Sequence, residues 1–287
     1  NFPRDHIILL NYDNIARAYA NPFNNSIFRE LDHQINVYPG LQYVDYRDKN
    51  VTANAFYGVL TGNRTLSGGQ RVLESTSEDN VYVFYDNHGG AGFLAVPERN
   101  GRYIYADELH EILLKMKNDR MFKNLFFPIT ACFSFSVGEV IGDILGIYGH
   151  TASGAEESSY AILYDEEVGA YLTSEYSYYK DHYIEDNANN GTIGEIFKYA
   201  LQMMTKSTPH EFGDISMRNM LISEFVGELH TNKVRRHHQM PRNYESVKET
   251  EAAQQVQDKH LAQVPRNKKE KRQQMMWAIQ DEMKKKA

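Results

Sequence analysis

Two runs of apolar residues have the length of buried strands, and each is followed by a residue that can do chemistry. The first run covers residues 81–85 and leads through Asp86 and Asn87 to His88. The second run covers residues 125–131 and is followed directly by Cys132, the only cysteine among 287 residues. Continuous apolar runs of this length are typical of strands buried on both faces of a parallel sheet. We therefore predict two such strands with an imidazole and a thiol at their carboxyl ends.

The rest of the pattern predicts alternating strands and helices. Helices are predicted over residues 51–60, 106–116, 137–145, 158–183 and 191–205, and further strands over 6–10, 93–96 and 147–152. Thr52 and Thr192 stand where helix N-caps are expected. This alternation predicts an α/β sandwich with a mostly parallel sheet. In such sheets the chemistry lies beyond the carboxyl ends of the strands, where His88 and Cys132 both fall.

The pattern changes near residue 231. Residues 231–257 show little apolar periodicity and predict a linker, whereas residues 258–287 recover helical spacing and end in three lysines. Residues 1–230 carry 17 Lys and Arg against 31 Asp and Glu, whereas residues 231–287 carry 14 against 7. We expect a main domain over 1–230 and a basic C-terminal region that binds this acidic body or an acidic partner, with a solvated helix as the alternative.

Composition narrows the class of protein. The chain is 41% hydrophobic and 24% charged, which is ordinary for a soluble globular protein. No run approaches the roughly 18–20 apolar residues of a membrane span. The sequence has no zinc or nucleotide-binding motif, and its acidic body disfavours nucleic acid, so we expect no metal, cofactor or nucleic-acid partner. A secretory route is favoured by four Asn-x-Ser/Thr triplets, at Asn24, Asn50, Asn63 and Asn190.

Cys132 has two open interpretations. It cannot form an internal disulfide, so it is either a small buried core residue or a nucleophile. A nearby imidazole promotes the reactive thiolate, which makes His88 the candidate base. Gly89 and Gly90 let the backbone approach a substrate and turn N–H groups toward an oxyanion. The expected chemistry is acyl transfer through a thioester, followed by hydrolysis or aminolysis.

The segments around this pair resemble a known family. Residues 85–92 (Tyr-Asp-Asn-His-Gly-Gly-Ala-Gly) and 129–132 (Ile-Thr-Ala-Cys) resemble the His-Gly and Ala-Cys motifs of legumain-type asparaginyl endopeptidases, which belong to the caspase-like cysteine protease clan. Similar segments extend over roughly residues 6–230, including 51–62 and 157–172. The resemblance implies a caspase-like three-layer α/β sandwich and a cysteine endopeptidase that cleaves after asparagine, or after aspartate, and sometimes ligates.

The resemblance also assigns roles to residues. Cys132 is expected to be the nucleophile, His88 the general base and Gly89 an oxyanion donor. The residues expected to line the substrate pocket are Thr130, Ser158, Ser159 and Glu175. The partners are protein or peptide substrates in a lysosomal, vacuolar or extracellular compartment. Residues 231–287 are expected to be an activation peptide and prodomain fragment that caps the site until acid pH releases it. Candidate self-cleavage positions are Asn232, Asn243 and Asn267.

Some features depart from the family pattern. The family has a strand and a helix ahead of residue 6, with an asparagine that orients the histidine, and this chain has no counterpart. Thr130 replaces an acidic residue, Glu175 is displaced by one position from the family's acid, and Asn87 replaces an aspartate. These departures keep two alternatives open: a catalytically impaired homologue that binds or regulates, and a transamidase. The catalytic subunit of the GPI-anchor transamidase has a His-Gly-Gly-x-Gly-Phe-Leu pattern that matches residues 88–94.

Overall fold

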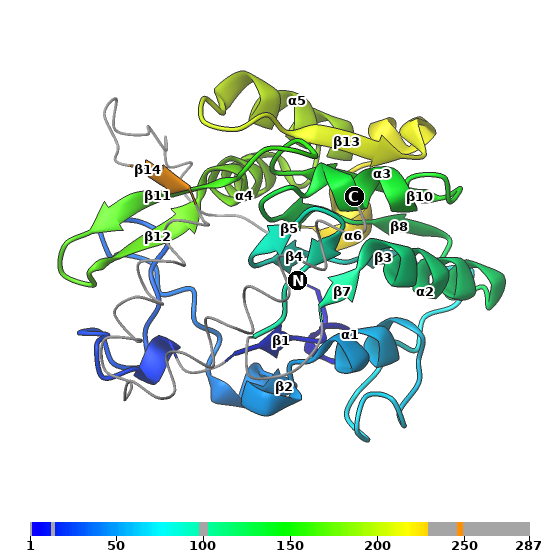
Figure 1. Cartoon of the computed structure of the whole chain (residues 1–287), viewed down its shortest axis with the longest axis horizontal. Coiled ribbons are helices and arrows are strands. Elements are labelled where there is room, and N and C mark those ends of the chain that lie inside the picture. The colour runs from blue at the N-terminus through cyan, green and yellow to red at the C-terminus, as the bar shows by residue number, and fades with distance from the viewer. Residues whose placement is uncertain (1, 13–14, 98–102, 229–245, 249–287) are drawn as a thin grey trace, which may run out of the picture. The chain divides into compact units, whose positions relative to one another are not determined.

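The computed structural model describes residues 2–12, 15–97, 103–228 and 246–248 and shows a sheet flanked by helices (Figure 1). The helices are α1 (Ala53–Leu60), α2 (Ala106–Asn118), α3 (Phe135–Ile141), α4 (Glu175–Asn187), α5 (Ile193–Met203) and α6 (Ser223–Val226). The strands up to the middle of the chain are β1 (Leu10–Asn11), β2 (Tyr46–Arg47), β3 (Asn80–Tyr82), β4 (Tyr85–Asp86), β5 (Gly89–Gly90), β6 (Phe93–Leu94) and β7 (Ile104–Tyr105). The later strands are β8 (Asn124–Phe126), β9 (Ile129–Thr130), β10 (Ile147–Thr151), β11 (Tyr160–Asp165), β12 (Ala170–Ser174), β13 (His210–Gly213) and β14 (Ser246–Lys248).

The main sheet has the strand order β3-β8-β10-β9-β4, with β13 added antiparallel to β10. All other pairs in this sheet are parallel. Between β3 and β4 the N–H of Val83 donates to the carbonyl of Phe126, and that of Tyr85 donates to the carbonyl of Pro128. The two predicted apolar runs therefore lie side by side as one long parallel pair, and the prediction of a mostly parallel sheet is confirmed.

Alternating side chains of this sheet face two helical layers. Leu125, Phe127 and Ile129 are fully buried in a cluster with residues of α1, α2 and α3. Phe126 and Tyr148 point to the other face, into a cluster that includes Ile193 and Ile196 of α5 and Ala188 just after α4. Apolar side chains on both faces require cover on both sides, because each exposed face would leave apolar area in water. This produces the predicted three layers.

The predicted N-caps begin their helices. The Thr52 hydroxyl accepts from the N–H of Ala55 at the start of α1. Thr192 and Glu195 form a reciprocal capping box at the start of α5. Each cap satisfies backbone N–H groups that have no partner within the helix, which fixes the first residue of the helix.

Three sequence predictions were wrong in part. Residues 160–174, predicted as helix, form the antiparallel β11–β12 hairpin, and the helix begins only at α4 after the N-cap Ser174. The predicted strand over 6–10 is reduced to β1, which pairs with β2. Within the predicted linker, residues 246–248 form β14, which pairs antiparallel with β11. In each case pairing between distant segments decided a conformation that local periodicity left ambiguous.

The C-terminal part of the chain is only briefly described. Contacts divide the chain into a unit of residues 1–249 and a unit of residues 250–287. The second unit lies outside the described residues, as do the predicted helix over 258–287 and the positions Asn232, Asn243 and Asn267.

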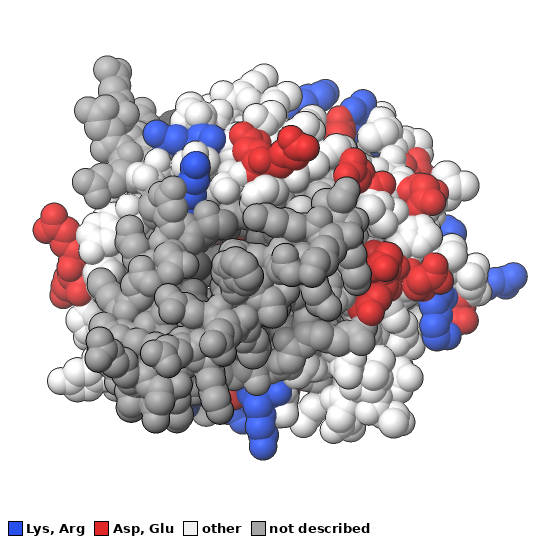
Figure 2. Space-filling model, in the orientation of Figure 1, with Lys and Arg blue, Asp and Glu red and all other residues white. Residues whose placement is uncertain are grey.

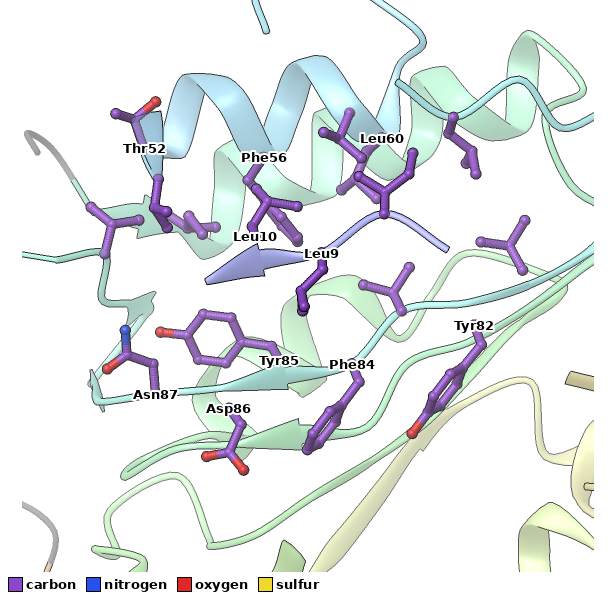
Figure 3. A pocket seen from close by; sticks show the side chains of 18 of the residues that line it. Leu9, Leu10, Thr52, Phe56, Leu60, Tyr82, Phe84, Tyr85, Asp86 and Asn87 are labelled. Carbon is purple, nitrogen blue, oxygen red and sulfur yellow. The ribbon is translucent and has the colours of Figure 1, made fainter. Parts of the chain in front are cut away.

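A cleft borders the outer edge of β3 and β4 (Figure 3). Among the described residues, these two strands pair only on the side of β8 and β9. Across the cleft lie β1 and α1, which contribute Leu10 and Phe56 to its lining, together with Leu9 just before β1. The cavity volume is about 250 Å³. Within the described residues, one edge of the main sheet is therefore unpaired beside the strand that leads to His88.

Candidate active site

Strand pairing brings His88 and Cys132 to one edge of the sheet. β4 and β9 are parallel, with Tyr85 opposite Ile129 and Asp86 opposite Thr130. His88 and Cys132 each lie two residues beyond the last pair, so the two neighbouring strands deliver them to equivalent positions. The loop after His88 contacts the cysteine, because a Cβ added to Gly89 would lie 2.7 Å from the Cys132 carbonyl oxygen. The predicted juxtaposition of the two strand ends is present.

Local hydrogen bonds fix the loop that carries His88. The Asn87 side-chain oxygen accepts from the N–H of His88 at 2.7 Å. The Tyr85 hydroxyl lies 2.8 Å from the carbonyl oxygen of His88 and 2.5 Å from that of Ala95. Gly89 and Gly90 form β5, which pairs with β6 in a short hairpin. The backbone around the imidazole is thus held from both sides.

The residue after the cysteine has an unusual backbone. Phe133 has a φ of 56°, a conformation that costs a residue other than glycine about 1–2 kcal/mol. Its N–H donates to the carbonyl of Glu157 at 2.7 Å. The Ser136 hydroxyl donates to the Phe133 carbonyl at 2.6 Å and accepts from the N–H of Gly92 at 2.8 Å. These bonds hold the turn and link the cysteine loop to the hairpin that follows His88.

The thiol of Cys132 is fully buried. Its sulfur lies 3.4 Å from the hydroxyl of Ser159 and 3.9 Å from the Ser159 carbonyl oxygen. Ser159, predicted as a pocket residue, therefore contacts the candidate nucleophile itself. In this rotamer the sulfur faces Ser159, just before β11. Attack on a substrate therefore requires that the cysteine side chain rotate or that the segment carrying Ser159 move away.

His88 can accept a proton near neutral pH. The residue is exposed along one side, while surrounding protein desolvates the imidazole in part. This desolvation lowers the pKa of His88 below its usual value of 6.5. A neutral imidazole is the protonation state that general-base catalysis needs.

The other predicted pocket residues fall into different environments. Ser158 is half-buried next to Ser159. Thr130 is fully buried, and its hydroxyl lies 3.0 Å from that of Ser177 on α4.

Glu175 does not match its predicted place in a pocket. Its side chain is fully buried at the start of α4. The carboxylate accepts from the N–H of Thr205 at 2.8 Å and from that of Lys206 at 3.1 Å. These bonds fix the loop after α5. The one-residue displacement noted in the sequence thus places this carboxylate on backbone amides and away from an accessible surface.

Sequence reasoning missed a polar residue near the pair, Asp86. The Ser177 hydroxyl donates to Asp86 Oδ2 at 2.7 Å. The carboxyl points away from Leu9 and Leu10, toward α4 (Figure 3). Water reaches the residue, but protein atoms on this side desolvate the carboxyl in part, which raises the pKa of Asp86 to about 6. A signal existed in the sequence, because strand alternation puts residues 86 and 88 on the same face.

The described residues contain neither a metal-binding cluster nor a membrane-spanning helix. No group of three or more His, Cys, Asp or Glu side chains there is arranged to hold a metal ion. No helix in that part of the chain is long and apolar enough to cross a membrane.

The chain is similar to proteins of one family. The model of the Peptidase C13 family matches residues 1–228. Legumain of Mus musculus is 31% identical over 79% of this chain and 52% of its own length. A vacuolar-processing enzyme of Vicia sativa is 33% identical over 78% and 48%, and a hemoglobinase of Schistosoma mansoni is 31% identical over 78% and 51%.

A solved structure of caspase-1 from Spodoptera frugiperda is similar with a TM-score of 0.41 and 13% identity, over 61% of this chain and 71% of that one. The chain spans about half the length of the curated relatives that it matches. Since the family model covers most of the chain and the relatives agree with it, this chain belongs to the Peptidase C13 family, as a protein of legumain type.

Proposed function

We propose that this protein is a cysteine endopeptidase that cleaves peptide bonds after asparagine, and after aspartate as a second substrate. The observation that carries the proposal is the delivery of His88 and Cys132 to one sheet edge by register-paired strands. Membership of the Peptidase C13 family supports it. The catalytic roles are those expected from the sequence: Cys132 as nucleophile, His88 as base and Gly89 as oxyanion donor.

The proposed reaction has two stages. His88 takes the thiol proton of Cys132, and the sulfur attacks the carbonyl carbon of the scissile bond. The N–H of Gly89 donates to the oxyanion that forms. The C–N bond breaks as protonated His88 gives its proton to the leaving amine, which leaves a thioester on the sulfur. His88 then activates water, which hydrolyses the thioester, or an incoming amine takes its place and forms a new peptide bond.

The pairing of β14 with β11 supports the proposed inhibition by the C-terminal region. Ser246 lies opposite Ile162 and Lys248 lies opposite Tyr160, so β14 runs toward Ser159. Ser159 contacts the thiol. A substrate that added to β11 in this direction would bring its carboxyl end toward Cys132. We propose that the chain's own C-terminal region occupies this edge before activation.

Charge supports the acid step of the proposal. The basic residues of 231–287 complement an acidic body, and Figure 2 shows groups of acidic side chains on the described surface. Protonation of body carboxylates at acid pH weakens this attraction. We propose release of the C-terminal region under these conditions.

We also propose a secretory route to a lysosome-like or vacuolar compartment, or to the exterior. The asparagines of all four glycosylation triplets are exposed on the described surface, as glycan attachment requires. Expression in a secretory host should give a mass that falls after removal of N-linked glycans. An unchanged mass contradicts glycosylation of these sites.

The test of the activity uses the full chain. The protein is acidified and then assayed with Ala-Ala-Asn and Ala-Ala-Asp fluorogenic peptides, beside the Cys132→Ala variant. We expect turnover by the wild-type chain alone. Turnover equal to that of the variant refutes the peptidase proposal. Turnover of equal rate without any acid step refutes the proposed capping by residues 231–287 and leaves the peptidase proposal standing.

One observation favours a second function, that of a non-catalytic binding protein. The thiol of Cys132 is fully buried, so the described conformation does not present a nucleophile. Labelling with iodoacetamide separates the two proposals. If acidified protein binds Ala-Ala-Asn peptides while Cys132 stays unlabelled and no turnover occurs, the binding function is supported and the enzymatic one is contradicted.

A further inference from the structure

A chain of hydrogen bonds connects the two strands that carry His88 and Cys132. Asp86 on β4 and Thr130 on β9 are register partners. The hydroxyl of Ser177, on α4, donates to Asp86 Oδ2 at 2.7 Å and lies 3.0 Å from the hydroxyl of Thr130. Ser177 is itself held by the N-cap of α4, where its N–H donates to Ser174 Oγ. The helix thus fixes the carboxyl from one side.

The Asp86 carboxyl belongs to a residue only two positions before His88, the proposed base. An extended strand rises about 3.3 Å per residue, so the two-residue step from Asp86 to His88, or from Thr130 to Cys132, spans at most about 6.6 Å. Alternation places residues 86 and 88 on the same face. In Figure 3, Tyr82, Phe84 and Asp86 point to one side of the strand, whereas Tyr85 and Asn87 point to the other. Asp86 also borders the cleft, while its carboxyl points away from Leu9 and Leu10.

The charged groups around Asp86 belong mostly to α4. Lys180 and Asp181 lie on this helix, and the Lys180 ammonium pairs with the Asp181 carboxylate. The same ammonium lies 3.9 Å from the centroid of the Phe84 ring. The titratable Tyr82 on β3 also hydrogen-bonds Lys180, while Thr130 on β9 carries no charge. Lys180 therefore adds a positive potential near Asp86, while its own contacts include Asp181, Phe84 and Tyr82.

One oxygen of the carboxyl is available for a ligand. Ser177 occupies Oδ2, and within the described residues no hydrogen-bond partner lies at Oδ1. An oxygen acceptor suits the N–H₂ of a carboxamide, which is neutral and is not repelled by Lys180. A cationic side chain would meet the like charge of Lys180, and a carboxylate would meet the like charge of ionised Asp86.

We propose that Asp86 is a specificity-determining residue whose Oδ1 accepts a hydrogen bond from the carboxamide of the asparagine at the scissile bond. The inference rests on the proposed asparaginyl endopeptidase function. The family pattern has an acidic residue at the position of Thr130 on β9. In this chain the proposal assigns that acidic role to Asp86 on the neighbouring strand β4. Ser177 is the positioning residue that orients this carboxyl.

The protonation of Asp86 gives the proposal a pH dependence. The pKa of Asp86 is raised to about 6 by desolvation, against the opposing effects of Ser177 and Lys180. Above that pH the carboxylate accepts from asparagine and repels aspartate. Below it the protonated carboxyl can donate to aspartate, so discrimination between the two substrates falls.

The test is Asp86→Asn, which keeps an oxygen for Ser177 and presents an N–H₂ group at the position of Oδ1. At about pH 7 we expect the ratio of kcat/KM for Ala-Ala-Asn over Ala-Ala-Asp to fall by about tenfold or more, the size of a charge-assisted hydrogen bond. The wild-type ratio should fall as the pH drops through about 6, and the ratio of the variant should not. The matched control is Asp79→Asn, since Asp79 also accepts from a hydroxyl, that of Thr76, on an exposed loop.

A binding measurement separates this inference from the proposed function. Both peptides are titrated into the Cys132→Ala chain with and without Asp86→Asn, and the ratio of dissociation constants at about pH 7 is compared. A tenfold change in the ratio supports the role of Asp86 even where the wild-type chain shows no turnover. Turnover by the wild type with ratios that Asp86→Asn leaves unchanged overturns the inference while the proposed function stands. An unchanged binding ratio overturns it as well.

Discussion

The buried His150 makes the fold sensitive to acid. This residue of β10 has no exposed surface. Its Nε2 lies 3.1 Å from the hydroxyl of Tyr148, which donates to Glu211, and its Nδ1 lies 3.2 Å from the hydroxyl of Tyr176. Because the Tyr148 hydroxyl donates its proton to Glu211, its oxygen can only accept from His150. The Nε2–H of His150 therefore donates to the Tyr148 oxygen, and Nδ1 of His150 accepts from the Tyr176 hydroxyl. The neutral imidazole thus has a partner at both nitrogens.

The free energy of this arrangement follows from the shift in pKa. Burial, with smaller effects of Lys180 and Arg218, lowers the pKa of His150 from 6.5 to about 3. A lowered pKa in the folded state stabilises the fold above the unfolded-state pKa, and this stabilisation is lost as the pH falls. Linkage gives a loss of about 2.5 kcal/mol between about pH 7 and about pH 4.5 from this residue alone. Since pH 4.5 lies above the folded-state pKa, the result depends mainly on the unfolded-state value.

The assay is urea unfolding of the wild type, His150→Gln and the control His6→Gln at both pH values. Glutamine retains a donor and an acceptor but does not titrate. His6 lies on the exposed surface. We expect the wild type and His6→Gln to lose about 2.5 kcal/mol more than His150→Gln on acidification. Equal losses in all three chains refute the reasoning, because the acid sensitivity would then come from other groups.

Three further predictions concern Gly89, Glu175 and the N-cap of α5. Gly89→Ala should destabilise the chain by about 1–3 kcal/mol and lower kcat/KM, since the new Cβ would lie 2.7 Å from the Cys132 carbonyl oxygen. The control is Gly154→Ala, where the nearest atom to the added Cβ lies 3.4 Å away. If both variants lose equal stability in urea unfolding and equal activity on peptides, the steric explanation is contradicted. Glu175→Gln should lower the free energy of unfolding by about 1–3 kcal/mol in thermal or urea unfolding. It should leave the ratio of asparagine to aspartate cleavage unchanged, and a changed ratio would show that Glu175 contributes to the substrate pocket. Thr192→Ala removes the capping box and should cost about 1 kcal/mol of unfolding free energy, while a loss below a few tenths speaks against the cap.

The strands and caps near the candidate site were predictable because their signals are local. The run over 125–131 is buried on both faces, so a continuous apolar pattern marks it without knowledge of its partners. In the run over 81–85, Val81, Val83 and Tyr85 are buried, whereas Phe84 on the opposite face is exposed because this strand lies at the edge of the sheet. Thr52 and Thr192 cap their helices through contacts only three residues away. The position of His88 and Cys132 after their strands follows directly from such signals.

The hairpin of β11 and β12 was not predictable in the same way. Its residues include several tyrosines, whose spacing fits either a strand or a helix, and its conformation depends on antiparallel pairing. The strand β14 likewise exists only through its partner β11. Neither pairing leaves a trace in the periodicity of the paired segments.

By itself, the sequence determined the alternation of strands and helices and the residues that carry the candidate chemistry, because burial and capping act on neighbouring positions. Only the tertiary structure decided what surrounds those residues. It placed Ser159 against the thiol of Cys132, used Glu175 to bind the loop after α5, and positioned Asp86 through Ser177 of α4. These contacts join segments dozens of residues apart, so their geometry depends on how the strands and layers pack.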